Sequence, residues 1–148
     1  MKSSPQVGDI HQFSFRVGEN KVVPALYPES DIFLSMPDVF ATGFMVGLME
    51  WACTDHLRPY LAEGEGSLGV LVDVDHSAPT LPGQVVTVVV TCDKADGRRL
   101  GWSVTASDEI DVIGQGRHER MVVEWGRFQR KLDEKRARLQ AICQANGG

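Results

Sequence analysis

Hydrophobic and polar residues alternate with a period of two in one segment near the start of the chain and in four segments of its second half. These segments run from Ile10 to Val17, Ser67 to Asp75, Gln84 to Cys92, Leu100 to Ser107 and Arg117 to Trp125. Such alternation is typical of strands with one buried face. Short stretches of turn-forming residues separate the later segments, so we expect a sheet whose consecutive strands pair mainly antiparallel.

The segment from Phe40 to Leu57 has apolar residues on every side of an α-helix. A helix at the protein surface would show a single apolar stripe, so this segment is predicted to be a buried helix. Gly43 and Gly47 weaken the helix by about 1 kcal/mol each relative to alanine, but they allow another backbone to come close.

Three prolines interrupt the apolar segment from Val23 to Pro37, which lies between the first strand and the helix. Proline is poorly tolerated inside a helix or a central strand, so we expect a long loop here. Loops of this length in a compact domain are usually functional, as lids or binding segments.

One apolar helix followed by a run of long strands predicts an α+β fold, in which an antiparallel sheet wraps around one long buried helix. This is the hotdog arrangement. Pairing of two copies into a longer sheet is one way to protect an exposed edge of such a sheet. We assign residues 1–128 to this domain and residues 129–148 to a basic C-terminal helix or tail.

Charge and composition exclude several classes of protein. The chain has 148 residues, of which residues 1–125 carry 9 Lys and Arg against 18 Asp and Glu, and residues 126–148 carry 6 against 2. An acidic body argues against nucleic-acid binding, and the apolar runs are too short to span a membrane. Three widely spaced cysteines favour a reducing cytoplasm, with neither a disulfide framework nor a zinc site. No cofactor is expected.

Glu50 is the most informative candidate for chemistry, because it is a carboxylate surrounded by apolar residues in the predicted buried helix. Burial of an unpaired carboxylate is costly, which favours a general base or nucleophile. The alternative is that Glu50 lies on the one hydrated side of the helix or pairs with an arginine.

His76 and Thr42 are further candidates. His76 follows a strand and precedes a proline-containing turn, where it could reach a cleft, although a lone histidine is more often structural. Thr42 could act as a nucleophile beside a base, or it could simply cap the helix. In one regular helix Thr42 and Glu50 are about 12 Å apart, so a histidine or a second subunit must connect them.

Glycine-rich segments occur at residues 64–69 and 114–116. The first matches the dinucleotide fingerprint, but the required order of strand and helix is reversed. Its glycines could still bring backbone N–H groups close to a ligand carbonyl. The second places Arg117 and Arg120 near an expected tight turn, where they are either solvated charges or phosphate contacts.

Several segments together resemble the fluoroacetyl-CoA thioesterase family of hotdog hydrolases. They are Leu26 to Ser30, Val39 to Cys53, Gly64 to Gly69, His76, and Gly116 with His118 to Arg120. The resemblance covers roughly residues 7–128 and is most specific around Thr42 and Glu50. It implies a homodimeric enzyme that hydrolyses a short acyl-CoA, most specifically fluoroacetyl-CoA, to the acid and CoA.

The resemblance also implies roles for individual residues. Thr42, Glu50 and His76 match the family's catalytic triad, Gly69 matches its backbone contact to the acyl group or carbonyl, and Arg120 matches an active-site arginine. The family's fluoroacetyl-specific member has a phenylalanine in its lid where this chain has Met36, although Phe33 is present. A general short-chain acyl-CoA thioesterase, an enoyl-CoA hydratase and a non-catalytic acyl-CoA-binding module are the alternatives.

Overall fold

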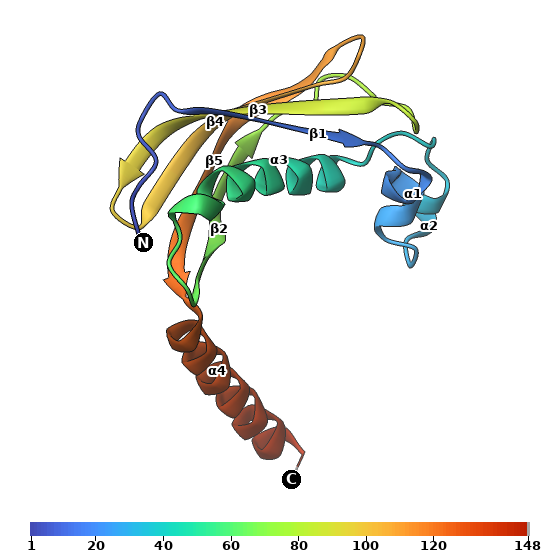
Figure 1. Ribbon diagram of the computed structural model, residues 1–148. Coiled ribbons are helices and arrows are strands. Elements are labelled where there is room, and N and C mark those ends of the chain that lie inside the picture. The colour runs from blue at the N-terminus through green and yellow to red at the C-terminus, as the bar shows by residue number, and fades with distance from the viewer. Residues whose placement is uncertain (148) are drawn as a thin grey trace.

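A five-stranded antiparallel sheet curves over one side of a helix, α3 (Figure 1). The computed structural model describes residues 1–147. The strands are β1 (Ile10–Arg16), β2 (Glu65–Val74), β3 (Val85–Asp96), β4 (Arg99–Ser107) and β5 (Val112–Glu124). Their order across the sheet is β1-β3-β4-β5-β2, so β1 and β2 form its edges. All neighbouring pairs are antiparallel, as the alternating segments predicted.

Helices make up most of the remaining chain. They are η1 (Glu19–Lys21), α1 (Val23–Leu26), α2 (Asp31–Leu34), α3 (Thr42–Leu57), η2 (Arg58–Tyr60) and α4 (Trp125–Asn146). The two short helices α1 and α2 lie together at the N-terminal end of α3, whereas α4 projects away from the sheet (Figure 1).

The core lies between α3 and the face of the sheet that curves over it. It includes Met45, Leu48, Met49 and Leu57 from α3, and Val86, Val88, Val90, Leu100, Trp102 and Val104 from the sheet. This arrangement confirms the predicted α+β hotdog fold. The other side of α3 carries Gly43, Gly47 and Trp51, which are exposed in the single chain.

The proline-containing segment differs from the predicted loop, because it forms α1 and α2. Pro24 lies in the first turn of α1, where its missing N–H has no partner to lose. Ser30 caps α2 by accepting a hydrogen bond from the N–H of Phe33. The expectation that proline excludes helix was wrong here because it overlooked the first turn.

The turn expected around Gly114 and Gly116 is also wrong, because β5 runs continuously through both residues. Each glycine is required by the close approach of β2. A Cβ on Gly116 would overlap the carbonyl oxygen of Asp73 on β2, and one on Gly114 would lie 2.5 Å from that of Asp75, which follows the end of β2. The glycines therefore allow two strands to pair, and Arg117 and Arg120 lie on a strand.

The helix α4 extends from the end of β5. Its first residue, Trp125, packs against Gly66 of β2, where a Cβ would overlap the indole ring. None of the α4 residues that the structure describes, 125–146, is buried. Within residues 1–147 no helix is both long enough and apolar enough to cross a membrane.

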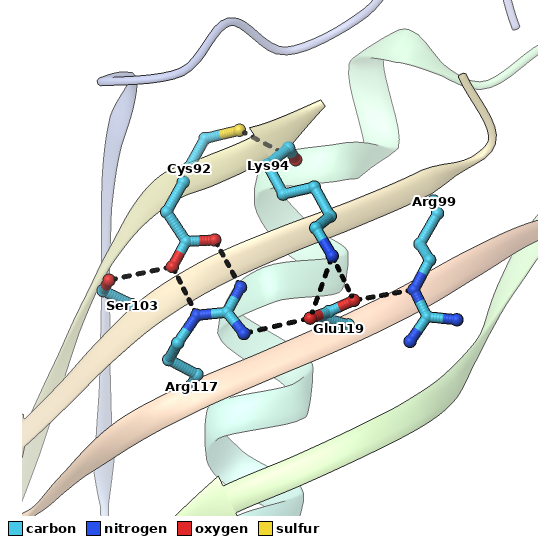
Figure 2. Close-up of polar contacts among 7 residues, drawn as sticks. Cys92, Lys94, Arg99, Ser103, Arg117 and Glu119 are labelled. Carbon is cyan, nitrogen blue, oxygen red and sulfur yellow. Dashed lines mark hydrogen bonds and ion pairs between the residues drawn. The ribbon is translucent and has the colours of Figure 1, made fainter. Parts of the chain in front are cut away.

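An ion cluster links three strands, as Figure 2 shows for Lys94, Arg99, Arg117 and Glu119. The Glu119 carboxylate accepts from Arg99 Nε at 2.7 Å and from Arg117 Nη1 at 2.9 Å, and its side chain is 4% exposed. Arg117 also binds Asp93 through two bonds of 2.7 Å. Hydrogen bonds from Arg99, Arg117 and Lys94 hold the pKa of Glu119 at about 2, below its ordinary 4.5.

The depressed pKa makes the stability of the fold depend on Glu119 in acid. The contribution of the ionised carboxylate is complete above pH 4.5 and is lost as the pH falls through about 2. Glu119→Gln is expected to lower the free energy of unfolding at neutral pH by about 1 to 3 kcal/mol. The substitution should also make the free energy of unfolding depend less on pH in the acid range, as measured by denaturant titration over a pH series. Glu134→Gln on the exposed α4 is the control. If the unfolding free energies of the parent and of Glu119→Gln fall in parallel as the pH is lowered, the role of the cluster is contradicted.

Candidate active site

Thr42 and His76 are in direct contact at the N-terminal end of α3. The Thr42 Oγ1 and His76 Nδ1 atoms are 2.7 Å apart. The N-cap of α3 is Ala41, so Thr42 is the first helical residue, and its hydroxyl bonds to the imidazole instead of capping the helix. The capping alternative is therefore wrong, and the structure pairs a hydroxyl with a potential base.

The surroundings of His76 favour the neutral form of its imidazole. Burial lowers the pKa of His76, and this outweighs the raising effects of the Ala78 backbone and of the Asp75 charge. A neutral imidazole can accept the Thr42 proton at Nδ1, and it then carries its own proton at Nε2. The Nε2 atom is buried and has no hydrogen-bond partner within residues 1–147.

A shallow cavity of about 270 Å³ lies beside this pair. Its lining consists of Val23, Val39, Phe40, Thr42, His76, Ser77, Ala78 and Pro79. The cavity is lined mainly by apolar side chains, with one imidazole and two hydroxyls, of which the Ser77 hydroxyl donates to the Val112 carbonyl and the Thr42 hydroxyl contacts the imidazole. This composition suits a small acyl group next to a proton-transfer pair.

Glu50 lies further along α3 and pairs with Arg120 of β5. Arg120 Nη1 donates to Glu50 Oε2 at 3.0 Å, and the side chains are 8% and 39% exposed respectively. Arg120 also donates from Nε to Ser67 Oγ at 2.8 Å and from Nη2 to the Ser67 carbonyl at 2.9 Å. The sequence alternative for Glu50 is thus observed in both respects: the carboxylate is partly hydrated and paired with an arginine.

Gly69 lies next to this ion pair, at a bulge in β2. The register of β2 with β5 shifts between Gly69 and Leu71. A Cβ on Gly69 would lie 3.4 Å from both Glu50 Oε2 and Arg120 Nη1, so the glycine backbone approaches the ion pair closely. Gly69 is exposed on its other side, because β2 is a sheet edge.

The predicted site residues therefore fall into two groups. Thr42 and His76 form the first, and Glu50, Gly69 and Arg120 form the second. Thr42 and Glu50 are eight positions apart in α3, which is a distance of about 12 Å along the helix axis. One chain does not bring the two groups into contact.

Phe33 and Met36 belong to the segment around α2. The Phe33 ring is half-buried and lies 6.0 Å from the ring of Tyr27, whereas Met36 is 40% exposed. Leu26 of α1 packs against Gly43, where a Cβ would come within 3.1 Å of the leucine side chain. The segment is thus seated on α3 directly beside Thr42, where a lid could close over the cavity.

His118 and Ser67 belong to the second group, but sequence reasoning assigned neither of them a role. His118 Nε2 lies 3.2 Å from Arg120 Nη1. The sequence signal for His118 was its position two residues before Arg120, because residues two positions apart share one face of a strand. Within residues 1–147 no three His, Cys, Asp or Glu side chains are arranged to hold a metal ion.

Several known proteins are similar to this chain in both sequence and fold. A sequence profile of the fluoroacetyl-CoA-specific thioesterase family matches residues 24–126. A curated fluoroacetyl-CoA thioesterase from Streptantibioticus cattleyicolor is 50% identical over 135 residues, which are 91% of this chain and 97% of that protein. A solved structure of a fluoroacetyl-CoA thioesterase superposes with a TM-score of 0.88 at 49% identity, covering 90% of this chain and 98% of that one.

A more distant relative extends the comparison. A hypothetical protein of Thermus thermophilus, described as a thioesterase superfamily member, has a TM-score of 0.83 at 31% identity and covers 95% and 99% of the two chains. The fold and the paired hydroxyl and imidazole thus place the chain among hotdog proteins of the thioesterase superfamily. More specifically, the chain belongs to the fluoroacetyl-CoA-specific thioesterase family.

Proposed function

We propose that this protein hydrolyses short acyl-CoA thioesters, with fluoroacetyl-CoA as its preferred substrate. The observation that carries the proposal is the 2.7 Å contact between Thr42 Oγ1 and His76 Nδ1 beside a small cavity. Family membership supports the substrate, because solved structures of a fluoroacetyl-CoA thioesterase include complexes with fluoroacetate and CoA and with acetyl-CoA. Hydrolysis of fluoroacetyl-CoA would detoxify fluoroacetate.

The proposed chemistry starts at His76. Its Nδ1 accepts a proton from Thr42, or from a water in the place of that hydroxyl, as the oxygen attacks the thioester carbonyl. The Gly69 N–H is proposed to stabilise the oxyanion that forms, with the positive charge of Arg120 nearby. The C–S bond then breaks, and the protonated imidazole returns its proton to the CoA sulfur. If Thr42 is the nucleophile, a water hydrolyses the acyl-threonine in a second step.

We propose that the active protein is a homodimer. Strand β2 is an open edge, and Val70 and Val72 on it are 46% and 50% exposed. On α3, Gly43, Gly47 and Trp51 are exposed in the single chain, Trp51 on the side of β1, and a Cβ at Gly47 would meet no atom within 4 Å among residues 1–147. An unpaired edge and a small-residue helix face are the features through which a second copy could extend the sheet and pack closely.

The dimer would also join the two groups of site residues. The buried Nε2–H of His76 requires an acceptor, and Glu50 of the same chain, about 12 Å along α3 from Thr42, is too distant to be that acceptor. Glu50 of the partner subunit is a carboxylate of the right chemistry, and it would hold the imidazole as the acid member of a triad does. Each of the two active sites would then combine Thr42 and His76 of one subunit with Glu50, Gly69 and Arg120 of the other.

The proposal is tested by thiol release. The purified protein should liberate free CoA from fluoroacetyl-CoA, followed with a thiol reagent, at a rate proportional to enzyme concentration. Binding of short acyl-CoA thioesters without thiol release would indicate a binding module. Loss of the conjugated absorbance of an enoyl-CoA, again without thiol release, would indicate a hydratase. Either result would contradict the proposed hydrolysis.

Substitutions of the contacting pair should separate chemistry from binding. His76→Ala is expected to lower kcat about 100- to 10,000-fold, the usual contribution of positioned proton transfer, while acyl-CoA still binds. Thr42→Ser should retain more activity than Thr42→Ala, because only serine keeps a hydroxyl. Calorimetric titration with acyl-CoA is the check on binding. Equal rates for the two Thr42 variants would remove the hydroxyl from the mechanism.

Selectivity is expected to depend on the lid segment. Fluorine barely enlarges an acetyl group, so the pocket discriminates by polarity and lid closure and not by size. The flexible Met36 offers a softer wall than an aromatic ring. The parent should prefer fluoroacetyl-CoA over acetyl-CoA, and Met36→Phe should widen the preference. The ratio of kcat/KM for the two thioesters measures it, with Leu34→Phe as the control. Equal efficiency towards both substrates in the parent would indicate a general short-chain thioesterase.

A further inference from the structure

His118 is a buried histidine with both ring nitrogens engaged. Its side chain projects from β5 toward α3 and is 1% exposed. The Nδ1 atom lies 2.8 Å from the carbonyl oxygen of Leu71 on β2. A carbonyl oxygen only accepts, so Nδ1 carries the ring proton and Nε2 presents a lone pair. Burial lowers the pKa of His118 and outweighs the raising effects of the Leu71 hydrogen bond and of the Glu50 and Glu119 charges, while the Arg120 charge lowers it further.

The free lone pair of His118 faces Arg120. Arg120 Nη1 donates to His118 Nε2 at 3.2 Å and to Glu50 Oε2 at 3.0 Å. The remaining bonds of the guanidinium go to Ser67 on the edge strand. The plane of the guanidinium is therefore fixed from two sides, by His118 and by Ser67, and this plane sets the direction in which Glu50 is held.

The same imidazole also fixes the bulge that contains Gly69. Leu71, which binds His118 Nδ1, is the first residue after the register shift of β2. A Cβ on Gly69 would lie 3.3 Å from His118 Cε1, so the ring edge packs directly against the glycine backbone. One side chain thus contacts both Gly69 and Arg120, and through Arg120 it acts on Glu50.

We propose that His118 is a positioning residue of the active site, whose neutral Nδ1–H tautomer fastens the β2 bulge and whose Nε2 orients Arg120 toward Glu50. The inference rests on the proposed hydrolysis, in which Glu50, Gly69 and Arg120 take part. In this role His118 does not contact the substrate, but it sets the geometry of Glu50, Gly69 and Arg120.

Two near-isosteric substitutions separate the two bonds of the ring. In His118→Asn the side-chain amide can replace Nδ1–H and keep the bond to Leu71, but it offers Arg120 no acceptor. In His118→Gln the amide oxygen reaches the position of Nε2 and keeps the acceptor for Arg120. Because a small misplacement of catalytic groups costs about 100-fold in rate, we expect His118→Asn to lower kcat by about that factor. KM should stay near that of the parent, and His118→Gln should recover most of kcat.

His56 provides the matched control. It is also a buried imidazole, 8% exposed, and its Nδ1 accepts a hydrogen bond from Trp102 Nε1 at 3.0 Å, outside the proposed site. His56→Gln and His56→Asn should lower the thermal unfolding temperature while kcat stays close to that of the parent. A merely structural role for His118 would give the same result, a loss of stability with no selective loss of kcat.

A double-mutant cycle with Arg120 provides the decisive readout. If His118 acts through Arg120, His118→Asn should have little further effect on kcat in an Arg120→Lys background. Additive losses, or equal kcat for His118→Asn and His118→Gln, would overturn the inference. If Arg120→Lys does not fold, the comparison of Asn with Gln decides alone. Wild-type kcat in His118→Asn would refute the positioning role and leave the proposed hydrolysis standing, whereas no thiol release by the parent would refute both.

Discussion

A rigid helix cannot bring its own residues 42 and 50 together, and this constraint governs the arrangement of the site. The sheet packs against one side of α3 and buries Met45 and Met49, so the helix can neither bend nor unwind to shorten the distance of about 12 Å. Thr42 is therefore fixed at one end of the helix beside His76, and Glu50 is fixed in its middle beside Arg120. In the proposed homodimer, α3 of the partner subunit would bring the missing group to each end.

Strand β5 carries the ion cluster on one face and residues of the candidate site on the other. Side chains alternate along it, so Arg117 and Glu119 form the ion cluster, while His118 and Arg120 point toward α3. The ion cluster ties β3, β4 and β5 together, and β5 in turn pairs with the edge strand β2. The position of Arg120 thus depends on the register of β5 with its neighbouring strands. The ion pairs on the opposite face of β5 help to fix that register.

The sequence predicted those features that depend on local patterns. Period-two alternation placed the strands, and the apolar segment placed α3, because burial of one sheet face and one helix determines those patterns. The short helices at Pro24 and Ser30 were missed because one turn of helix leaves no periodic signal. The role of Gly116 was missed because its cause, the carbonyl of Asp73 on another strand, is distant in sequence. The contact of Glu50 with Arg120 joins residues 70 positions apart, so only the fold could show that this arginine is its partner.

The composite site is tested most directly by a heterodimer in which each subunit carries a different defect. His76→Ala and Glu50→Gln subunits with different affinity tags would be co-expressed, and the dimer that carries both tags would be purified. Each variant homodimer should be nearly inactive. The heterodimer contains one site with both defects and one intact site, so it should recover about half of the parent's rate of CoA release. A heterodimer as inactive as the two homodimers would contradict a site shared between subunits.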